Sequence, residues 1–127
     1  AEWMRQICAA ISALHSAGIC HRDVKPENFM VKVSWDSVFG KASQLKLADF
    51  GLATFLGRGR LLKVKCGTPS FMSPELHLLP KKSDGYGFPV DVWAVGISMY
   101  VMMFGGRRPF RDLRGLLDMR QLVEAHL

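Results

Sequence analysis

The first residues of the chain carry apolar side chains at a helical spacing. Trp3, Ile7, Ile11 and Leu14 recur three or four residues apart, which places them on one face of a helix. Gly18 follows at a point where the end of a helix favours a residue with positive φ. The pattern predicts an amphipathic helix that buries one face and ends near Gly18.

Two short apolar runs follow a polar stretch. Residues 29–33 and 45–48 have the composition and alternation of short strands. Residues 34–44 between them contain the turn-forming types Asp, Ser and Gly, which indicates a connecting loop. Together these segments predict a small β-hairpin and not a large sheet.

The second half of the chain combines loops with one long apolar run. Residues 51–74 contain no acidic side chain and several glycines, which predicts a mobile loop. Asp91 precedes an uncharged run over residues 92–106, so we expect a buried helix with Asp91 as its N-cap. This run is shorter than the roughly 20 residues that a membrane span needs. Residues 107–127 are charged and predict a further helix near the end.

The overall composition is that of a folded domain. Of 127 residues, 49% are hydrophobic and 22% are charged, which excludes a disordered chain. The cysteines are three in number, and their odd count and spacing argue against a disulfide framework. They also fit no standard zinc site. A reducing compartment, and so a cytoplasmic location, is the expectation.

The net charge of +6 raises the question of a nucleic-acid partner. Arginines cluster at positions 107, 108, 111 and 114, but no aromatic residues are interleaved with them as nucleic-acid binding would favour. A solvated basic helix face is the better interpretation. We expect neither a nucleic-acid nor a membrane partner.

Residues 21–28 (His-Arg-Asp-Val-Lys-Pro-Glu-Asn) concentrate chemistry between the first helix and the first strand. This loop aims a carboxylate (Asp23), an ammonium (Lys25) and an amide (Asn28) at one point. Asp49 adds a second carboxylate where the second strand ends. Asparagine and carboxylate oxygens are hard ligands that Mg²⁺ accepts alongside phosphate oxygens. The set indicates phosphoryl transfer, which needs positioning and charge stabilisation more than covalent help.

Four motifs in this chain resemble those of the protein kinase superfamily, and they occur in the family's order. Residues 21–28 resemble the catalytic loop, and residues 48–51 (Ala-Asp-Phe-Gly) resemble the metal-binding motif. Residues 67–75 (Gly-Thr-Pro-Ser-Phe-Met-Ser-Pro-Glu) resemble the end of the activation segment. Residues 91–96 (Asp-Val-Trp-Ala-Val-Gly) are similar to the start of the family's central helix.

The resemblance implies a mainly α fold (α+β in the full domain), namely a protein-kinase-like C-lobe with a short β-hairpin. The family's glycine-rich phosphate loop, lysine strand and partner glutamate helix do not occur in the chain. We therefore interpret residues 1–127 as a partial kinase domain whose N-lobe is absent. Its expected parts are a catalytic loop at 21–28, an Asp-Phe-Gly motif at 49–51, an activation segment at 49–75 and a central helix at 91–104.

The same resemblance implies ATP and Mg²⁺ as cofactors and a role for each polar residue. Asp23 would orient the substrate hydroxyl or accept its proton. Lys25 would neutralise the γ-phosphate, and Asn28 and Asp49 would hold two magnesium ions. Thr68 would hydrogen-bond toward Asp23 and Lys25 and so help to bind the substrate.

Further positions concern the substrate and the subgroup. Met30 matches the position that packs beneath the adenine ring. Glu27 matches an acidic residue that meets a substrate arginine in basophilic kinases, although a solvated loop charge explains it equally well. Lys25 and the Gly67–Thr68 pair resemble serine/threonine kinases, so a protein with a serine or threonine acceptor is the expected substrate.

The chain most resembles the calcium/calmodulin-dependent group, which implies a regulatory segment or a calcium-sensor partner. The usual activation-loop phosphorylation site, four residues before Thr68, is Val64, so Arg22 lacks the phosphate that it would normally pair with. We therefore expect switching by a partner or a regulatory segment. A non-catalytic kinase-like binding module, or a truncated gene product, is the alternative.

Overall fold

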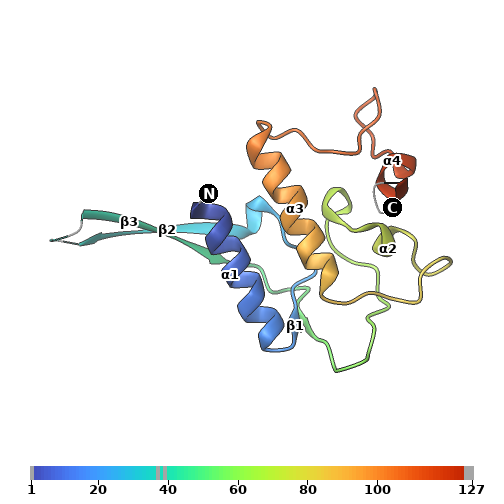
Figure 1. Cartoon of the computed structure of the whole chain (residues 1–127), viewed down its shortest axis with the longest axis horizontal. Coiled ribbons are helices and arrows are strands. Elements are labelled where there is room, and N and C mark those ends of the chain that lie inside the picture. The colour runs from blue at the N-terminus through green and yellow to red at the C-terminus, as the bar shows by residue number, and fades with distance from the viewer. Residues whose placement is uncertain (1, 37, 39, 125–127) are drawn as a thin grey trace.

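Two fifteen-residue helices pack against each other at the centre of the molecule (Figure 1). The computed structural model describes residues 2–36, 38 and 40–124, with about 38% helix and 19% strand. Helix α1 spans Glu2–Ser16 and helix α3 spans Pro89–Met103. Ile7 and Ile11 are buried on α1, as the helical pattern predicts, whereas Trp3 at the start of the same face is 48% exposed. The first core cluster joins these helices and contains Ile7, Ile11, Val24, Phe71, Ala94, Val95 and Ile97.

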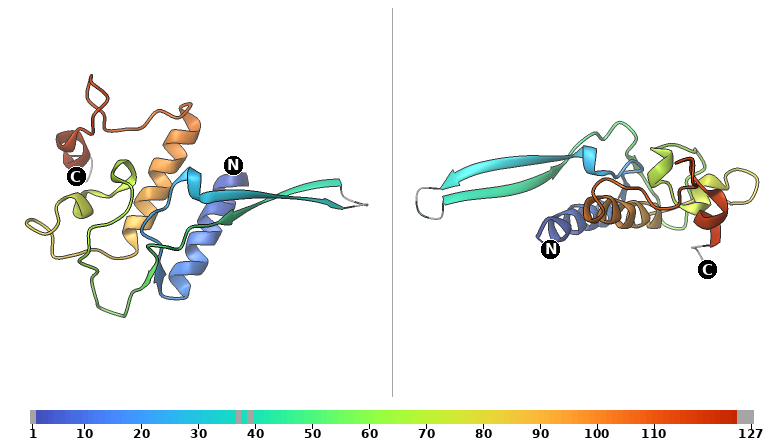
Figure 2. Two further views of the ribbon diagram at one scale, coloured as in Figure 1. Left: turned by 180° about the vertical axis from the view of Figure 1, so that it is seen from behind. Right: turned by 90° about the horizontal axis from the view of Figure 1, so that it is seen from above.

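A long hairpin extends from these helices, and it corrects the predicted short one (Figures 1 and 2). Strands β2 (Phe29–Asp36) and β3 (Gly40–Leu47) pair antiparallel along their whole length, so the loop predicted at residues 34–44 is wrong. The strands continue because β-branched and aromatic side chains alternate through residue 35, while Gly40, with a φ of +76°, takes the conformation that the turn requires. Ser37, the serine nearest the middle of the predicted loop, lies outside the described residues.

The segment that was predicted to be a mobile loop, residues 51–74, contains regular structure. Strand β4 (Thr54–Phe55) pairs antiparallel with β1 (Ile19–Cys20), and a 3₁₀ turn spans Pro69–Phe71. The Leu56 amide also donates to the Gly18 carbonyl at 2.8 Å. This pairing ties the chain after the second strand of the hairpin to the chain just before His21.

A second core cluster is formed mainly by residues 72–90. The short helix α2 (Pro74–His77) contributes Leu76, which is 2% exposed. Helix α4 (Met119–Glu124) confirms the helix expected near the end, and the residues after 124 lie outside the described part. The second cluster contains Cys20, Met72, Leu76, Leu79, Tyr86 and Val90.

Helix α3 begins two residues earlier than the sequence suggests. Pro89 occupies its first turn, where proline is well tolerated because that amide has no helical partner. Asp91 is therefore inside the first turn, so the predicted N-cap role is wrong. On the outer part of the helix Met99, Met102 and Met103 are exposed. Within the described residues, no helix has both the length and the apolar character to cross a bilayer.

Candidate active site

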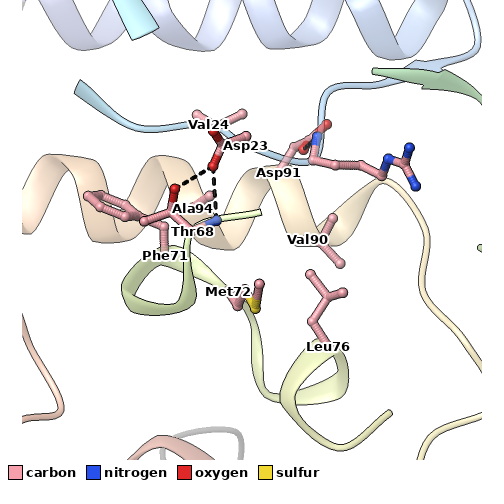
Figure 3. A pocket seen from close by; sticks show the side chains of 10 residues that line it. Asp23, Val24, Thr68, Phe71, Met72, Leu76, Val90, Asp91 and Ala94 are labelled. Atoms are coloured by element: carbon pink, nitrogen blue, oxygen red, sulfur yellow. Dashed lines mark hydrogen bonds between the residues drawn. The ribbon is translucent and has the colours of Figure 1, made fainter. Parts of the chain in front are cut away.

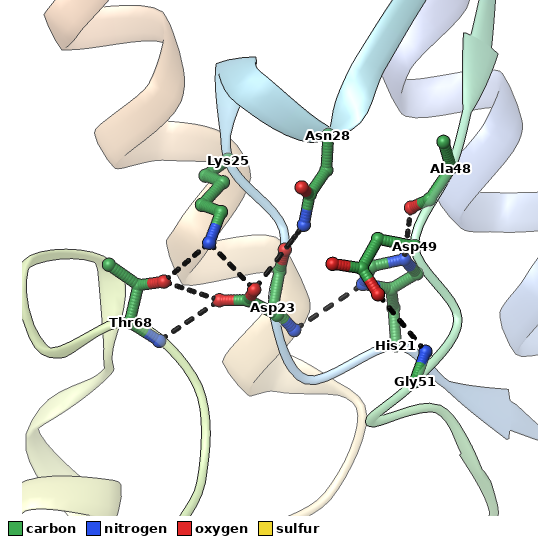
Figure 4. A network of polar contacts seen from close by, with 8 residues as sticks. All are labelled: His21, Asp23, Lys25, Asn28, Ala48, Asp49, Gly51 and Thr68. Carbon is green, nitrogen blue, oxygen red and sulfur yellow. Dashed lines mark hydrogen bonds and ion pairs between the residues drawn. The ribbon is translucent and has the colours of Figure 1, made fainter.

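The Asp23 carboxylate is the centre of a polar network beneath the hairpin (Figure 4). Its Oδ1 accepts hydrogen bonds from the Thr68 amide at 2.9 Å and the Thr68 hydroxyl at 2.7 Å. Its Oδ2 accepts from Lys25 Nζ at 2.8 Å and from Asn28 Nδ2 at 3.3 Å. Three residues that the sequence singled out thus bond to the side chain of a fourth, Asp23, a residue that is only 8% exposed.

Asp23 is held in its ionised form. Burial alone would raise its pKa, but the hydrogen bonds from Lys25 and Thr68 and the positive charge of Lys25 outweigh burial and lower the pKa below its ordinary value. Lys25 Nζ also donates to Thr68 Oγ1 at 2.8 Å, so the ammonium bridges the carboxylate and the hydroxyl. At neutral pH the site presents a carboxylate and an ammonium in fixed mutual positions.

Asn28 is positioned by the turn that precedes the hairpin. The 3₁₀ turn Pro26–Asn28 is closed by a hydrogen bond from the Asn28 amide to the Lys25 carbonyl at 3.0 Å. The side chain is 7% exposed, and its Nδ2 donates to the Asp23 carbonyl at 2.7 Å. Because nitrogen makes these bonds, the amide oxygen is the atom that can ligate a cation.

The hairpin register brings Asp49 beside Asn28 (Figure 4). The Ala48 amide donates to the Asn28 carbonyl at 2.8 Å, and this bond extends the ladder beyond the Phe29–Leu47 pair. Asp49 follows with a φ of +57°, a left-handed conformation that aspartate tolerates better than most residues. Its exposed carboxylate accepts a hydrogen bond from the Gly51 amide at 3.3 Å.

The oxygens of Asn28 and Asp49 fit the ligand chemistry of magnesium. Both are hard donors, and Mg²⁺ sites commonly combine one or two carboxylates with substrate phosphates and waters. Across residues 2–36, 38 and 40–124, no three His, Cys, Asp or Glu side chains gather in a group that could hold a metal ion. A magnesium ion at this pair would therefore complete its shell with phosphate and water oxygens.

His21 links the loop to the end of the hairpin. The ring is fully buried, its Nδ1 lies 3.3 Å from the Asp23 amide, and its Nε2 lies 3.2 Å from the Ala48 carbonyl. An amide can only donate and a carbonyl can only accept, so Nδ1 is the acceptor and Nε2 carries the proton. The neutral ring fixes the distance between the Asp23 loop and the Asp49 segment.

Asp91 anchors the same loop from helix α3, and the sequence analysis missed this role. Its carboxylate is 1% exposed and accepts hydrogen bonds from the His21 amide at 2.8 Å and the Arg22 amide at 2.9 Å. His15 Nε2 on helix α1 lies 2.9 Å from the same carboxylate. The signal was present in the motif at residues 91–96, but local sequence does not show which distant amides a carboxylate will meet.

Gly67 lets the chain just before Thr68 approach the loop of residues 21–28 closely. Its φ is +106°, and a Cβ at this position would lie 2.4 Å from the Arg22 carbonyl oxygen. No side chain larger than hydrogen fits in that space. The close approach is what places Thr68 against Asp23.

Arg22, which the sequence analysis left without a phosphate partner, is bonded within the chain. Its Nε donates to the Leu52 carbonyl at 2.6 Å and its Nη1 donates to the Tyr86 hydroxyl at 3.2 Å. That hydroxyl donates in turn to the Val64 carbonyl at 2.6 Å. Burial raises the pKa of Tyr86 to about 12, so the phenol stays protonated and keeps this donor.

The network rests on apolar support (Figure 3). In this view Asp23 and Thr68 lie above Met72 and Leu76, with the Phe71 ring beside Thr68, and these residues line a cavity of only about 10 Å³. A space of this size holds about one water molecule at most. The side chain of Asp23 is therefore closely packed from below, which limits its movement.

The remaining predicted positions lie outside this network. Met30 on strand β2 pairs across the hairpin with Lys46 and is 64% exposed. Glu27 is exposed on the 3₁₀ turn. The geometry leaves both interpretations of Glu27 open, and the adenine-packing role of Met30 stays a prediction.

The chain is similar to known protein kinases along almost its whole length. The family described as "Protein kinase domain" matches residues 1–126. A Dictyostelium discoideum protein named "Probable serine/threonine-protein kinase fhkE" is 38% identical over 121 residues, which cover 95% of this chain and 16% of that protein. "Serine/threonine-protein kinase GG21441" of Drosophila erecta and "Serine/threonine-protein kinase CG17528" of Drosophila melanogaster are each 46% identical over 102 residues, covering 80% of this chain and 12% of theirs. The matched region is thus a small part of each relative.

Proposed function

This chain belongs to the protein kinase domain family, and we propose that it serves a longer protein as the segment that transfers the γ-phosphoryl group of ATP to serine or threonine hydroxyls of protein substrates. The names of its relatives support the acceptor class. The observation that carries the proposal is the bonding of Asp23, Lys25 and Thr68 to one another. These bonds join the carboxylate of Asp23, the ammonium of Lys25 and the hydroxyl of Thr68 in one network.

Asp23 takes the role of orienting the acceptor hydroxyl or receiving its proton. Its lowered pKa keeps the carboxylate ionised at neutral pH, and its four hydrogen bonds fix the direction of both oxygens. A positioned general base typically contributes about 10²- to 10⁴-fold to a rate.

Lys25 supplies positive charge where the phosphoryl group passes. Its ammonium lies 2.8 Å from both the Asp23 carboxylate and the Thr68 hydroxyl, between the base and the activation segment. A dissociative phosphoryl transition state spreads negative charge over oxygens, which a fixed cation stabilises. We assign Lys25 to neutralising the γ-phosphate.

Asn28 and Asp49 are the residues that would hold magnesium. Magnesium held by these two side chains would supply positive charge against the phosphate oxygens during transfer. The Ala48–Asn28 backbone bond sets the separation of the two side chains, so the hairpin register determines the site. Met30 would pack beneath the adenine ring, and Glu27 would meet a substrate arginine.

We further propose that the protein is of the calcium/calmodulin-dependent type and is switched by a regulatory segment or a calcium-sensor partner. Arg22, which would otherwise pair with an activation-loop phosphate, is already bonded to Leu52 and Tyr86. Tyr86 in turn bonds to Val64, the residue at the usual phosphorylation position. These contacts hold the segment without a phosphate. Activation that depends on phosphorylation elsewhere in the segment would contradict this proposal.

The test is phosphoryl transfer by the purified full-length protein to a peptide with one serine acceptor, in the presence of ATP and Mg²⁺. Asp23→Asn and Asp49→Ala are expected to abolish transfer, because one removes the base and the other a metal ligand. Asp84→Ala, which removes an exposed carboxylate outside the network, is the matched control and is expected to retain activity. Near-normal turnover by either site variant would refute the assigned role. Absence of transfer by the unmodified protein would favour a non-catalytic binding module.

A further inference from the structure

Two arginine side chains converge on the hydroxyl of Ser70. Arg108 Nη1 and Arg111 Nη2 each donate to Ser70 Oγ at 3.1 Å. Ser70 is half-buried in the 3₁₀ turn Pro69–Phe71, two residues after Thr68. The arginines follow helix α3, about forty residues further along the chain, so this contact is tertiary and not a consequence of local sequence.

Both guanidinium groups are held by further contacts. Arg108 lies over the ring of Phe71, 5.7 Å from its centroid, and that ring is only 3% exposed. Arg111 also donates to the Gly115 carbonyl. A ligand that binds side chains already fixed in place loses less conformational entropy in doing so.

Within the part of the chain that the structure describes, neither arginine has an acidic partner. None of the ion pairs found in residues 2–36, 38 and 40–124 includes Arg108 or Arg111. Ser70 is neutral, and because its oxygen accepts both bonds its own O–H remains a donor. The three groups together offer two cations and a hydroxyl proton to one point, which is the donor set of an anion site.

We propose that Arg108, Arg111 and Ser70 form a binding site for an acidic side chain of the protein substrate, a carboxylate or a phosphate close to the acceptor residue. This inference rests on the proposed function, because the position of the acidic side chain is derived from an acceptor hydroxyl placed at Asp23. Ser70 and Thr68 are two residues apart, so their Cα atoms are separated by at most about 7 Å. An extended peptide rises about 3.3 Å per residue. The acidic side chain is therefore expected two or three residues from the acceptor.

The test uses the full-length protein and peptides with one serine acceptor. Asparagine, aspartate and phosphoserine are placed in turn at each of the three positions on either side of it. At one position, aspartate and phosphoserine are expected to raise kcat/KM about tenfold over asparagine, the size of a charge-assisted hydrogen bond, mainly through KM. The preference should shrink when salt is raised from about 50 mM to about 500 mM, because exposed ion pairs are screened.

Variants separate this site from general electrostatic attraction. Arg108→Gln and Arg111→Ala are expected to bring the ratio of acidic to neutral kcat/KM toward one. Arg107→Ala removes an exposed arginine beside the site and is expected to leave the ratio unchanged. The proposal would be overturned if the ratio of acidic to neutral kcat/KM were equal in all three variants. It would also be overturned if the unmodified protein preferred an acidic residue at none of the positions tested.

A binding measurement separates failure of this site from failure of the proposed function. Fluorescence anisotropy compares a labelled phosphoserine peptide with its unphosphorylated form, without ATP. The site predicts about tenfold tighter binding of the phosphopeptide by the unmodified protein, and loss of that difference in Arg108→Gln. The difference is expected even if the protein transfers no phosphate, and its absence would refute the site.

Discussion

Thr68 donates two hydrogen bonds to one oxygen of Asp23, from its amide at 2.9 Å and from its hydroxyl at 2.7 Å. The two residues are far apart in sequence, one in the loop after β1 and the other in the segment of residues 51–74, just before the 3₁₀ turn Pro69–Phe71. Because the bonds share Oδ1, the position of the carboxylate depends on the position of that segment. A displacement of that segment would leave the Asp23 carboxylate with only its bonds from Lys25 and Asn28, so the contact makes the orientation of this carboxylate sensitive to the conformation of the segment.

Replacing Thr68 by alanine removes one of these bonds and the hydroxyl that Lys25 contacts. We expect kcat for peptide phosphorylation to fall about tenfold, the cost of one hydrogen bond to a charged group. Thr68→Ser keeps the hydroxyl and is expected to retain most of the activity. Steady-state kinetics of the full-length protein measure both values. Equal kcat values for the alanine and serine variants would show that the hydroxyl has no catalytic part.

Gly67→Ala tests the close approach behind the same contact. The new Cβ would lie 2.4 Å from the Arg22 carbonyl oxygen, in a residue with positive φ, so the segment must shift. We expect a loss of about 3 kcal/mol in the free energy of unfolding, measured by urea denaturation. Gly59→Ala is the matched control, because Gly59 also has a positive φ (+69°) but nothing lies within 4 Å of its Cβ position. Its expected loss is about 1 kcal/mol, and equal losses would mean that strain, not contact, governs both sites.

Asp91→Ala tests how the loop of residues 21–28 is anchored. The change leaves the buried amides of His21 and Arg22 without their acceptor, so we expect the free energy of unfolding to fall by about 3–5 kcal/mol. Asp118→Ala is the control, since Asp118 also accepts two backbone amides, those of Arg120 and Gln121, but at a more exposed site before helix α4. Its expected cost is about 1 kcal/mol. Comparable losses in the two variants would contradict a special role for Asp91.

The pH dependence of stability follows from the lowered pKa of Asp23. The folded protein favours the ionised carboxylate, so this contribution to stability is present above the ordinary aspartate pKa, about 4. It is lost as the pH falls below that value and through the lower pKa of the folded state. Urea denaturation between about pH 3 and pH 6 should therefore show a steeper decline for the unmodified protein than for Asp23→Asn. Parallel declines would mean that the pKa of Asp23 is not lowered by folding.

The two long helices were predictable from the sequence, because the spacing of apolar residues alone indicates them. The burial of Ile7 and Ile11 follows from helical spacing, and the apolar run before Gly106 predicted helix α3. The hairpin was underestimated because residues 34–44 combine turn-forming types with strand formers. Local propensity does not show that an eight-residue partner strand will pair with them.

The site was predictable as a set of residues but not as a set of contacts. The motif at residues 21–28 and its resemblance to a kinase loop identified Asp23, Lys25 and Asn28, and the structure shows them bonded. Asp91 was interpreted as a helix cap because capping is a local property, whereas its bonds to the loop span about seventy residues. The meeting of Arg108 with Ser70 was missed for the same reason.

Ser73 and Ser98 offer a matched test of buried hydroxyl groups, because they are 1% and 0% exposed. Ser98 Oγ donates to the Ala94 carbonyl at 2.8 Å, whereas Ser73 Oγ is buried among the described atoms without a hydrogen-bond partner. An unpaired buried hydroxyl costs roughly what a made hydrogen bond contributes, about 1 kcal/mol, so the two alanine substitutions should have opposite signs. Ser73→Ala is expected to raise the melting temperature by about 4 °C and Ser98→Ala to lower it by a similar amount. Differential scanning calorimetry measures both shifts, and a lower melting temperature for Ser73→Ala would show that its hydroxyl is satisfied in solution, for instance by a buried water.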